Sequence, residues 1–270
     1  MEFPARSTLS TSKDSRSETM VVMNEINNLL IIQARTSSRR LPGKVLIPVN
    51  GKPILEWQIL RVLQTANIDQ VVMATSVESS DDQVEAIANR CGIPVVRGSL
   101  ENVFSRFAKA VDVYQPKVVI RITGDCPLYM PTLCEMMMNE FEKISVDYLS
   151  NTLMPTYPDG CDIEIFSSGV IRELEQMHLT SGELEHVTLG IYQRNQHFNC
   201  KNFTNNVNEN SHRWTLDTPD DLEFVRKIYE EFKGRETSFA YEDVMSFLKE
   251  NPELARYDDG TMRNSGLRNV

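Results

Sequence analysis

The sequence predicts an α/β fold in which a mostly parallel sheet carries helices on both faces. Short apolar runs of strand length alternate with longer amphipathic stretches between residues 28 and 143. This alternation is typical of parallel sheets with crossover helices. The first run, residues 29–32, is apolar throughout, as expected of a strand buried on both faces. With 270 residues and 41% hydrophobic content, the chain can form one substantial domain with a small appendage.

The composition excludes several classes of partner. The formal net charge is −10, so nucleic-acid binding has no bulk electrostatic support, and any polyanion site must be a local basic pocket. The five cysteines form no CxxC pair, as expected of reduced thiols in a cytoplasmic protein. No stretch approaches the ~20 apolar residues of a membrane span, and the N-terminus lacks the apolar run of a secretory signal. We therefore expect a cytoplasmic protein that binds neither nucleic acid nor a membrane.

A basic loop follows the first predicted strand. In open α/β sheets the ligand crevice lies beyond the carboxyl ends of the strands. A basic loop at that place suits an anionic ligand, although a solvated surface loop would have the same composition. The basic residues are Arg35, Arg39, Arg40 and Lys44, and residues 41–43 form a predicted turn.

The alternation of strands and helices then continues. Pro53 fits the first turn of the next helix, and Ser79 and Asp81 are both candidate caps for the helix after it. We predict helices over residues 54–63, 82–90 and 101–114, a strand over residues 71–75, and a short strand that ends at residues 97–99.

The next buried strand, residues 118–122, leads to a candidate metal ligand. It is followed by Thr123, Gly124 and Asp125, so the Asp125 carboxylate lies just past the carboxyl end of a central strand. A carboxylate there can hold Mg²⁺, which takes oxygen ligands and usually keeps waters and substrate phosphates as the others. An Asx turn or a helix cap is the structural alternative for an isolated Gly-Asp pair.

The following region contains a predicted strand with alternating polar residues. Residues 160–166 alternate between polar and apolar side chains, as a half-buried strand does, and Asp162 and Glu164 are polar members of that pattern. A strand edge that simply faces solvent would look the same. We also predict a helix over residues 131–143, a strand over residues 146–149 and a last helix over residues 241–250.

Another candidate ligand, Asp217, lies immediately before a predicted helix. Thr218 is a plausible N-cap with Pro219 at the first helical position, and Asp220 and Asp221 suit the positive end of the helix dipole. The helix start thus accounts for those two carboxylates. Asp217 precedes the cap and is not needed for it.

Three separated motifs resemble those of the nucleotide-sugar cytidylyltransferases, in particular the spore coat polysaccharide protein F branch. They are Gln33-Ala34-Arg35 with Ser38 and residues 40–44, residues 121–128, and residues 213–222. Shorter matches occur at residues 160–166 and 185–188, and together the matches span residues 29–232. The sequence departs from the family pattern at Thr36, at Ser37 (usually Gly), at Arg39 (Thr) and at Leu184 (Arg).

The resemblance implies a fold and an activity. The fold is the Rossmann-like nucleotide-diphosphosugar transferase fold, with a mixed, mostly parallel sheet. The activity is Mg²⁺-dependent transfer of CMP from CTP to a sugar acid with release of pyrophosphate, for surface polysaccharide or glycoconjugate biosynthesis, and relatives imply a homodimer. A dinucleotide G-x-G-x-x-G fingerprint and a Walker A loop are both absent from the sequence, which argues against a dehydrogenase and a P-loop NTPase.

The resemblance also implies a role for each matched residue. Asp125 and Asp217 would hold the metal and, with Arg35 and Lys44, would be catalytic. Asp162, Glu164 and His186 would contact the acceptor sugar, although a lone histidine such as His186 is also a common structural residue. The nucleotide-binding residues would be Gln33, Ala34, Arg35, Ser38, Arg40, Lys44, Thr123 and Gly124.

Two other functional hypotheses remain open at this point. A glycosyltransferase of the same fold would use a nucleotide-sugar donor and would release no pyrophosphate. A degenerate nucleotide-binding protein is suggested by the departures at Ser37 and Leu184. In each case we expect a flexible N-terminal tail over residues 1–27, a nucleotidyltransferase domain over residues 28–232, and a C-terminal helix with a polar tail over residues 233–270.

Overall fold

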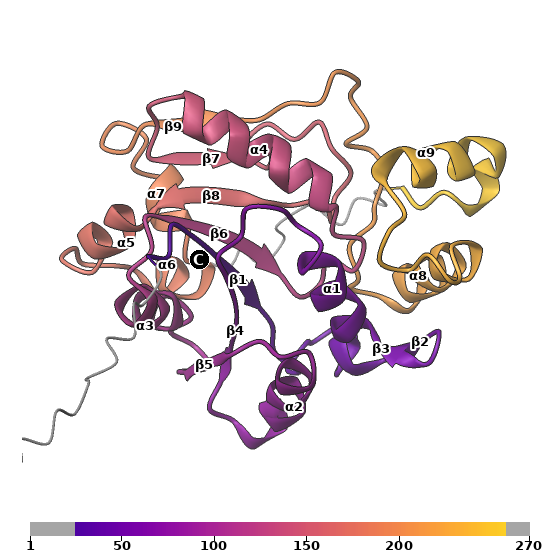
Figure 1. Ribbon diagram of the computed structural model, residues 1–270, viewed down its shortest axis with the longest axis horizontal. Helices are drawn as coiled ribbons and strands as arrows, with labels where there is room; N and C mark the ends of the chain where they lie inside the picture. Colours follow the sequence, from indigo (N-terminus) through magenta and orange to yellow (C-terminus); the bar gives the residue numbers. More distant parts are fainter. Residues whose placement is uncertain (1–24, 258–270) are drawn as a thin grey trace, which may run out of the picture.

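The computed structural model describes residues 25–257 of the chain, and a β-sheet flanked by helices forms its centre (Figure 1). Most of the predicted N-terminal tail, residues 1–24, and the end of the predicted polar tail, residues 258–270, lie outside the described residues. No helix within residues 25–257 has the length and apolar character needed to cross a membrane.

Seven strands of the described residues form one sheet. In spatial order they are β5 (Val95–Gly98), β4 (Gln70–Ser76), β1 (Asn28–Gln33), β6 (Val118–Thr123), β8 (Glu164–Ser167), β7 (Tyr148–Ser150) and β9 (Cys200–Asn202). β1 lies between β4 and β6 and is parallel to both, and β5 is parallel to β4. β8 is antiparallel to β6 and β7, whereas β9 is parallel to β7. The prediction of a mixed, mostly parallel sheet is confirmed.

Helices cover both faces of this sheet, as predicted. Successive side chains of β1 point to opposite faces, so Leu30 and Ile32 join one hydrophobic cluster while Leu29 and Ile31 join another. On the first face lie α1 (Ile54–Val62), α2 (Asp82–Arg90), α4 (Pro131–Lys143), α8 (Pro219–Glu231) and α9 (Tyr241–Glu250). On the second lie α3 (Phe104–Tyr114), α5 (Ser168–Leu174), α6 (Ser181–His186) and α7 (Leu189–Tyr192).

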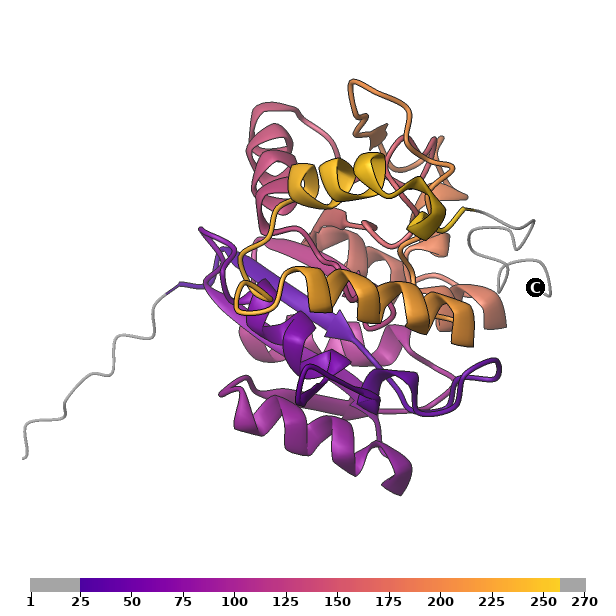
Figure 2. The ribbon, with the colours of Figure 1, turned by 90° about the vertical axis from the view of Figure 1, so that its right-hand side faces the viewer.

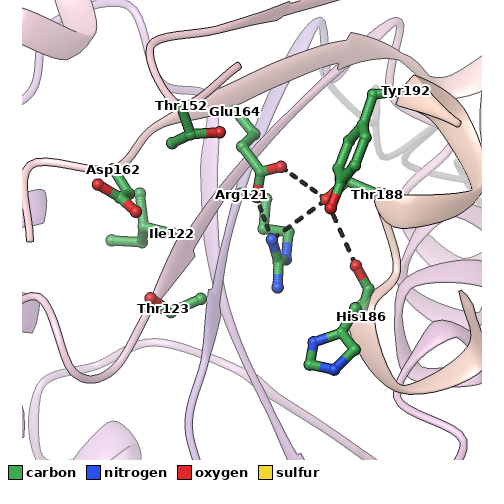
Figure 3. Close-up of a pocket in the computed structure, with 9 residues that line it drawn as sticks. All are labelled: Arg121, Ile122, Thr123, Thr152, Asp162, Glu164, His186, Thr188 and Tyr192. Carbon is green, nitrogen blue, oxygen red and sulfur yellow. Dashed lines mark hydrogen bonds and ion pairs between the residues drawn. The ribbon is translucent and has the colours of Figure 1, made fainter. Parts of the chain in front are cut away.

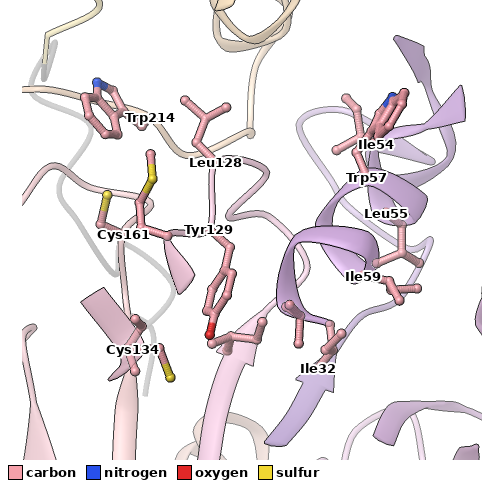
Figure 4. Close-up of a cluster of buried hydrophobic side chains, with 14 of the residues drawn as sticks. Ile32, Ile54, Leu55, Trp57, Ile59, Leu128, Tyr129, Cys134, Cys161 and Trp214 are labelled. Atoms are coloured by element: carbon pink, nitrogen blue, oxygen red, sulfur yellow. The ribbon is translucent and has the colours of Figure 1, made fainter. Parts of the chain in front are cut away.

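The first hydrophobic cluster fixes α1 against the sheet and against the loop that follows β6 (Figure 4). Ile54, Leu55 and Ile59 are fully buried, as their helical spacing predicts. They pack in one cluster with Ile32 of β1 and Tyr129 of the loop. Burying one such aliphatic side chain contributes ~1.5–3 kcal/mol, so this contact holds the loop firmly in place.

Three predicted elements begin later than expected. The helix predicted from residue 101 begins at Phe104, and the N–H of Ser105 in its first turn donates to Asn102 Oδ1 at 2.9 Å. The strand predicted over residues 160–166 begins only at Glu164, and β7 lies at 148–150 rather than 146–149. Asp162 is therefore in the loop before β8 and not in the strand.

Several short elements gave no recognisable signal in the sequence. α5, α6 and α7 have 7, 6 and 4 residues, which is two turns or fewer, so no hydrophobic period can repeat in them. β9 has three residues. A small hairpin of β2 (Pro48–Val49) and β3 (Lys52–Pro53) precedes α1, so Pro53 ends a strand instead of lying in the first turn of the helix.

Candidate functional site

β1 and β6 are parallel neighbours that end at the same edge of the sheet. Gln33 of β1 pairs with Thr123 of β6, and the N–H of Gly124 donates to the carbonyl oxygen of Gln33 at 2.8 Å. A Cβ atom at Gly124 would lie only 2.8 Å from the Cβ atom of Ala34, so glycine is required for this close approach. The structure therefore brings together the predicted nucleotide-binding residues Gln33, Ala34, Thr123 and Gly124.

Lys44 connects the two predicted metal carboxylates. Its Nζ lies 3.2 Å from Asp125 Oδ2 and 2.7 Å from Asp217 Oδ1. Lys44 starts a short 3-10 turn directly after Gly43, which adopts a left-handed conformation with φ 68°. Burial opposes the positive charge of Lys44, but the two carboxylates outweigh it and raise the pKa of the ammonium group above its ordinary value.

Asp125 is fixed by the loop that carries it. Thr123 Oγ1 donates to Asp125 Oδ1 at 2.6 Å, and the carbonyl oxygen of Asp125 accepts from the N–H of Leu216 at 2.8 Å. Burial raises the pKa of the Asp125 carboxyl, but the charge of Lys44 and the Thr123 hydrogen bond lower it by more. The resulting pKa is about 2. Asp125 is thus ionised at neutral pH, as binding of a cation requires.

Gln58 of α1 supports the Asp125 loop from the core side, a role that the sequence analysis did not identify. The side chain is fully buried, and its Nε2 donates to the carbonyl oxygens of Thr123 at 2.8 Å and Cys126 at 3.0 Å. These carbonyls lie on either side of Asp125. The available signal was position: Gln58 is four residues after Ile54, so it lies on the buried face of the helix.

Asp217 lies among basic side chains from two separate motifs. Arg40 Nη2 is 2.6 Å from Asp217 Oδ2, and Arg213 Nη2 is 3.5 Å from the same oxygen. The helix that follows is capped as predicted, since Thr218 Oγ1 accepts from the N–H of Asp221 and the Asp221 carboxylate accepts from the N–H of Thr218. The cap does not use the Asp217 carboxylate, which instead contacts Lys44, Arg40 and Arg213.

Arg213, the first residue of the motif 213–222, is a second residue of the site for which no role was predicted from the sequence. Its side chain is 2% exposed, and Nη1 donates to Asp159 at 3.1 Å. Nε and Nη2 donate to the two oxygens of Asp221 at 3.0 and 3.1 Å. A bidentate arginine–carboxylate pair has a fixed geometry, so Arg213 holds the segment that carries Asp217. The sequence feature that could have indicated this role is the position of Arg213, a charged residue beside the apolar Trp214 in a motif that matches the family.

Arg35 points towards a different part of the site. Its Nη2 lies 3.2 Å from Glu185 Oε1, so the pair links the basic loop to the Glu185–Thr188 motif. Ser38 shapes the loop, because its Oγ accepts from the N–H of Leu41 at 3.4 Å. Ser37 is exposed and is not among the described residues with positive φ, so its backbone conformation needs no glycine.

Asp81 has another role than the helix cap that was predicted. Among the described residues, α2 has no side-chain cap. Asp81 Oδ1 instead accepts from the N–H and Oγ1 of Thr36 at 2.8 and 2.7 Å, and Oδ2 accepts from the hydroxyl of Ser76. Burial raises the pKa of Asp81, but these hydrogen bonds lower it overall. Asp81 therefore ties the basic loop to the end of β4. Its contact in the loop is Thr36, one of the positions at which the sequence departs from the family pattern.

A pocket of about 510 Å³, including space open to solvent, adjoins this edge of the sheet (Figure 3). It contains the three residues that were expected to contact the acceptor, Asp162, Glu164 and His186. The lining residues are Arg121, Ile122, Thr123, Thr152, Asp162, Glu164, His186, Thr188 and Tyr192.

An ion pair between Arg121 and Glu164 forms one wall of this pocket (Figure 3). The two residues are cross-strand neighbours of β6 and β8, and both side chains are about nine-tenths buried. Glu164 Oε1 also accepts from the hydroxyls of Tyr148 and Thr188, each at 2.6 Å. Arg121 Nε and Nη2 donate to Oε1 of Gln33 at 3.1 and 3.0 Å, which connects the pocket to the predicted nucleotide-binding residues.

The segment that brings His186 and Thr188 into the pocket has a strained backbone. Val187, between them, is fully buried and has φ 46°, a conformation that β-branched residues rarely adopt. Strain of this kind costs ~1–3 kcal/mol and tends to occur at functional sites. Thr188 Oγ1 also lies 3.4 Å from the His186 carbonyl oxygen, across a tight turn.

A profile of the cytidylyltransferase family matches residues 29–242. The chain belongs to this family. This chain is 32% identical over 240 residues to the spore coat polysaccharide biosynthesis protein SpsF of Bacillus subtilis. The aligned region covers 86% of this chain and 98% of that protein. It is therefore an enzyme of the nucleotidyltransferase type, which favours nucleotidyl transfer over the glycosyltransferase and degenerate hypotheses.

Two further relatives of the cytidylyltransferase are informative. A solved cytidylyltransferase from Leptospira borgpetersenii superposes with a TM-score of 0.82 at 29% identity, covering 86% of this chain and 98% of that one. An 8-amino-3,8-dideoxy-manno-octulosonate cytidylyltransferase of Shewanella is 29% identical over 144 residues, which is 52% of this chain and 57% of that protein. The Rossmann-like nucleotidyltransferase fold is thus shown.

The residues of the cytidylyltransferase fit a divalent metal. Within the described residues no group of three or more histidine, cysteine, aspartate or glutamate side chains could hold a metal ion by itself. Mg²⁺, however, is usually bound by one or two carboxylates together with waters and substrate phosphates. Asp125 and Asp217, which share Lys44 as a partner, supply that pair of oxygen donors.

Proposed function

We propose that this cytidylyltransferase transfers CMP from CTP to a sugar acid and releases pyrophosphate, with Mg²⁺ as its cofactor. The observation that supports this proposal is the contact of Lys44 with both Asp125 and Asp217. It joins the three motifs into one site with a cation and two carboxylates. Attack of a sugar hydroxyl on the α-phosphorus needs such a site, because the leaving pyrophosphate gains negative charge.

Each basic residue of the loop has a proposed task in holding the triphosphate. Lys44 and Arg40 lie beside Asp217, where they would contact the phosphates next to the metal. Arg35 is held by Glu185 and would bind a phosphate at the side of the acceptor pocket. Gln33, Ala34, Ser38, Thr123 and Gly124 would position the rest of the nucleotide.

The carboxylates would orient the metal rather than the sugar. Asp125 and Asp217 would hold Mg²⁺. When bound, the metal would neutralise negative charge on the phosphates. Thr123 and Arg213 would keep the two carboxylates in place, since Thr123 donates to Asp125 and Arg213 contacts Asp217. Removal of one such interaction in the transition state costs ~3 kcal/mol, by analogy with the loss of an oxyanion donor.

The acceptor would occupy the pocket beside Thr123. Asp162, Glu164 and His186 line that pocket and can accept or donate hydrogen bonds to sugar hydroxyls. The Shewanella relative carries an octulosonate in its name and the Bacillus relative a spore coat polysaccharide. Both names support a sugar acid destined for a surface polysaccharide or glycoconjugate.

Further parts of the proposal concern the whole molecule. We propose a cytoplasmic homodimer that acts on small molecules without nucleic acid or membrane partners. Its nucleotidyltransferase domain would comprise residues 28–232, preceded by residues 1–27 and followed by a C-terminal segment (233–270).

The decisive experiment measures pyrophosphate release from each of the four NTPs with Mg²⁺, against a panel of ulosonic acids and sugar phosphates. Release with CTP and one sugar acid, abolished by EDTA, would support all parts of the activity. Release with a sugar phosphate and no acid would contradict the sugar-acid acceptor. Silence with every pair, in protein shown to be folded, would contradict nucleotidyl transfer, and binding of nucleotide-sugar donors would then be measured.

A further inference from the structure

The C-terminal segment of the described chain returns to the candidate active site. We use the name strap for residues 243–257, which lie beyond the end of the family match at residue 242. α8 and α9 lie side by side in both views (Figures 1 and 2), and Phe247 of α9 packs against Phe232. The chain then runs along the segment before Asp217: the N–H of Arg213 donates to the carbonyl oxygen of Arg256 at 2.8 Å, and His212 forms a β-bridge with Tyr257.

The strap also supplies a charge to the interior of the site. Arg256 Nε lies 3.4 Å from Asp221 Oδ1, and the Asp221 carboxylate is completely buried. The same carboxylate receives the bidentate pair from Arg213. Its Oδ2 accepts from the backbone N–H groups of Asp217 at 3.0 Å and Thr218 at 2.9 Å. Asp221 is therefore the group on which the backbone of Asp217 is fixed.

We propose that Arg256 is a positioning residue for the nucleotide–metal site, acting on Asp217 through Asp221; this inference rests on the proposed function. Arg213 contacts three carboxylates, Asp221 at 3.0 Å, Asp159 at 3.1 Å and Asp217 at 3.5 Å. Arg256 compensates part of the charge of Asp221, so that Arg213 can also serve Asp217. Without Arg256, the buried charge of Asp221 would depend on Arg213 alone, and Arg213 would be drawn from Asp217. Neighbours that orient metal ligands typically change metal affinity or activity by ~10–100-fold when they are lost.

The test compares Arg256→Gln and Arg256→Lys with the wild-type protein. The affinity for CTP is measured by calorimetry without acceptor, once with Mg²⁺ and once with EDTA. We expect Arg256→Gln to weaken CTP binding about tenfold with Mg²⁺ and to leave the affinity in EDTA unchanged, because Asp217 acts on the nucleotide through the metal. Arg256→Lys keeps the charge and should recover most of the affinity. The control is Arg226→Gln, which removes an exposed ion pair with Glu223 on α8 and should bind as the wild type does.

The possible outcomes separate this inference from the proposed function. Wild-type protein that binds none of the four NTPs would overturn the proposed function. Equal CTP affinity of wild type and Arg256→Gln with Mg²⁺ would overturn the positioning role alone. Equal weakening with Mg²⁺ and with EDTA, or a lysine variant as weak as the glutamine variant, would also overturn it, because the effect would then be one of general structure and not of charge at Asp221.

Discussion

Lys44 donates to Asp217 across 173 positions of sequence, with Nζ 2.7 Å from Oδ1. This contact joins the basic loop after β1 to the segment before α8, and a second contact of the same ammonium group reaches Asp125 at 3.2 Å. A cation shared by two carboxylates neutralises charge that would otherwise drive them apart. In the proposed reaction Lys44 has two kinds of partner, these carboxylates and the phosphates of CTP.

The first prediction concerns Asp217. In Asp217→Asn, we expect kcat/KM for pyrophosphate release to fall about 100-fold or more, equivalent to roughly 3 kcal/mol, because the substitution removes the charge of a proposed metal ligand that is also a partner of Lys44. The measurement is steady-state kinetics with CTP and the identified acceptor. Asp112→Asn, at an exposed position on α3, is the matched control and should retain wild-type kinetics. Turnover of Asp217→Asn within twofold of wild type would contradict the assignment.

The second prediction concerns the pKa of Asp125. Lys44 lowers this pKa and burial raises it, so in Lys44→Met we expect the pKa to rise from about 2 above the ordinary 3.8. Carboxyl carbon NMR during an acid titration measures the pKa directly, with Asp125→Asn to identify the resonance. A pKa below the unfolded value stabilises the folded state above about pH 4, and that stabilisation is lost as the pH falls towards 2. The loss of folding stability between about pH 4 and 2 that comes from Asp125 should therefore be present in the wild-type protein and absent in Lys44→Met. An unchanged pKa in the variant would show that Lys44 does not act on Asp125.

The third prediction concerns the contact between the loops after β1 and β6. A Cβ atom at Gly124 would lie 2.8 Å from the Cβ atom of Ala34, so Gly124→Ala must push the two loops apart. We expect a loss of ~1–3 kcal/mol in the free energy of unfolding, and weaker CTP binding. Denaturant unfolding and calorimetry measure the two effects. The control is Gly169→Ala in α5, where the added Cβ would meet only Ser167 Oγ at 3.8 Å and should not destabilise the protein. Wild-type stability and CTP affinity in Gly124→Ala would rule out the close contact.

The sequence predicted the central part of the fold because long patterns were present. Strands such as residues 29–32 have full apolar runs and helices such as residues 131–143 have several turns of period, and the structure has them at nearly those bounds. Short elements failed for the opposite reason. α7, with four residues, cannot display a period, and its place depends on packing against distant strands.

The candidate site was predictable where a residue both carries charge and ends a strand or precedes a helix. Asp125 and Asp217 satisfied that rule, and the structure places them on one lysine. Supporting residues could not be predicted in the same way, since their partners are backbone atoms or side chains far along the chain. Arg213 reaches Asp159 over 54 positions, and no local pattern announces such a contact.

The fourth prediction concerns Gln58 and the loop that it supports. Gln58→Leu keeps the apolar face of α1 but removes the side-chain donor to the carbonyl oxygen of Cys126 and one of the two donors to that of Thr123, which keeps the N–H of Cys126 at 3.2 Å. We expect a loss of ~1–3 kcal/mol of stability for these groups and a lower kcat, because the Asp125 loop is less fixed. Thermal unfolding and kinetics measure both. Gln64→Leu is the control, since Gln64 is exposed just after the end of α1 and its side chain donates to the carbonyl oxygen of Leu60. A variant with wild-type stability and kcat would show that the loop does not need this support.

The last prediction concerns the wall of the acceptor pocket. Glu164→Gln keeps the size of the side chain but removes the charge that compensates Arg121, and it replaces an acceptor of the Tyr148 and Thr188 hydroxyls by an amide. Because Glu164, Arg121 and Thr188 line the proposed acceptor pocket and not the proposed phosphate site, we expect KM for the acceptor to rise about tenfold while KM for CTP changes less than twofold. Bisubstrate kinetics separate the two constants. A matched rise in both would mean that Glu164 acts through Gln33, which Arg121 contacts at 3.0 Å, and that the pocket does not hold the acceptor by itself.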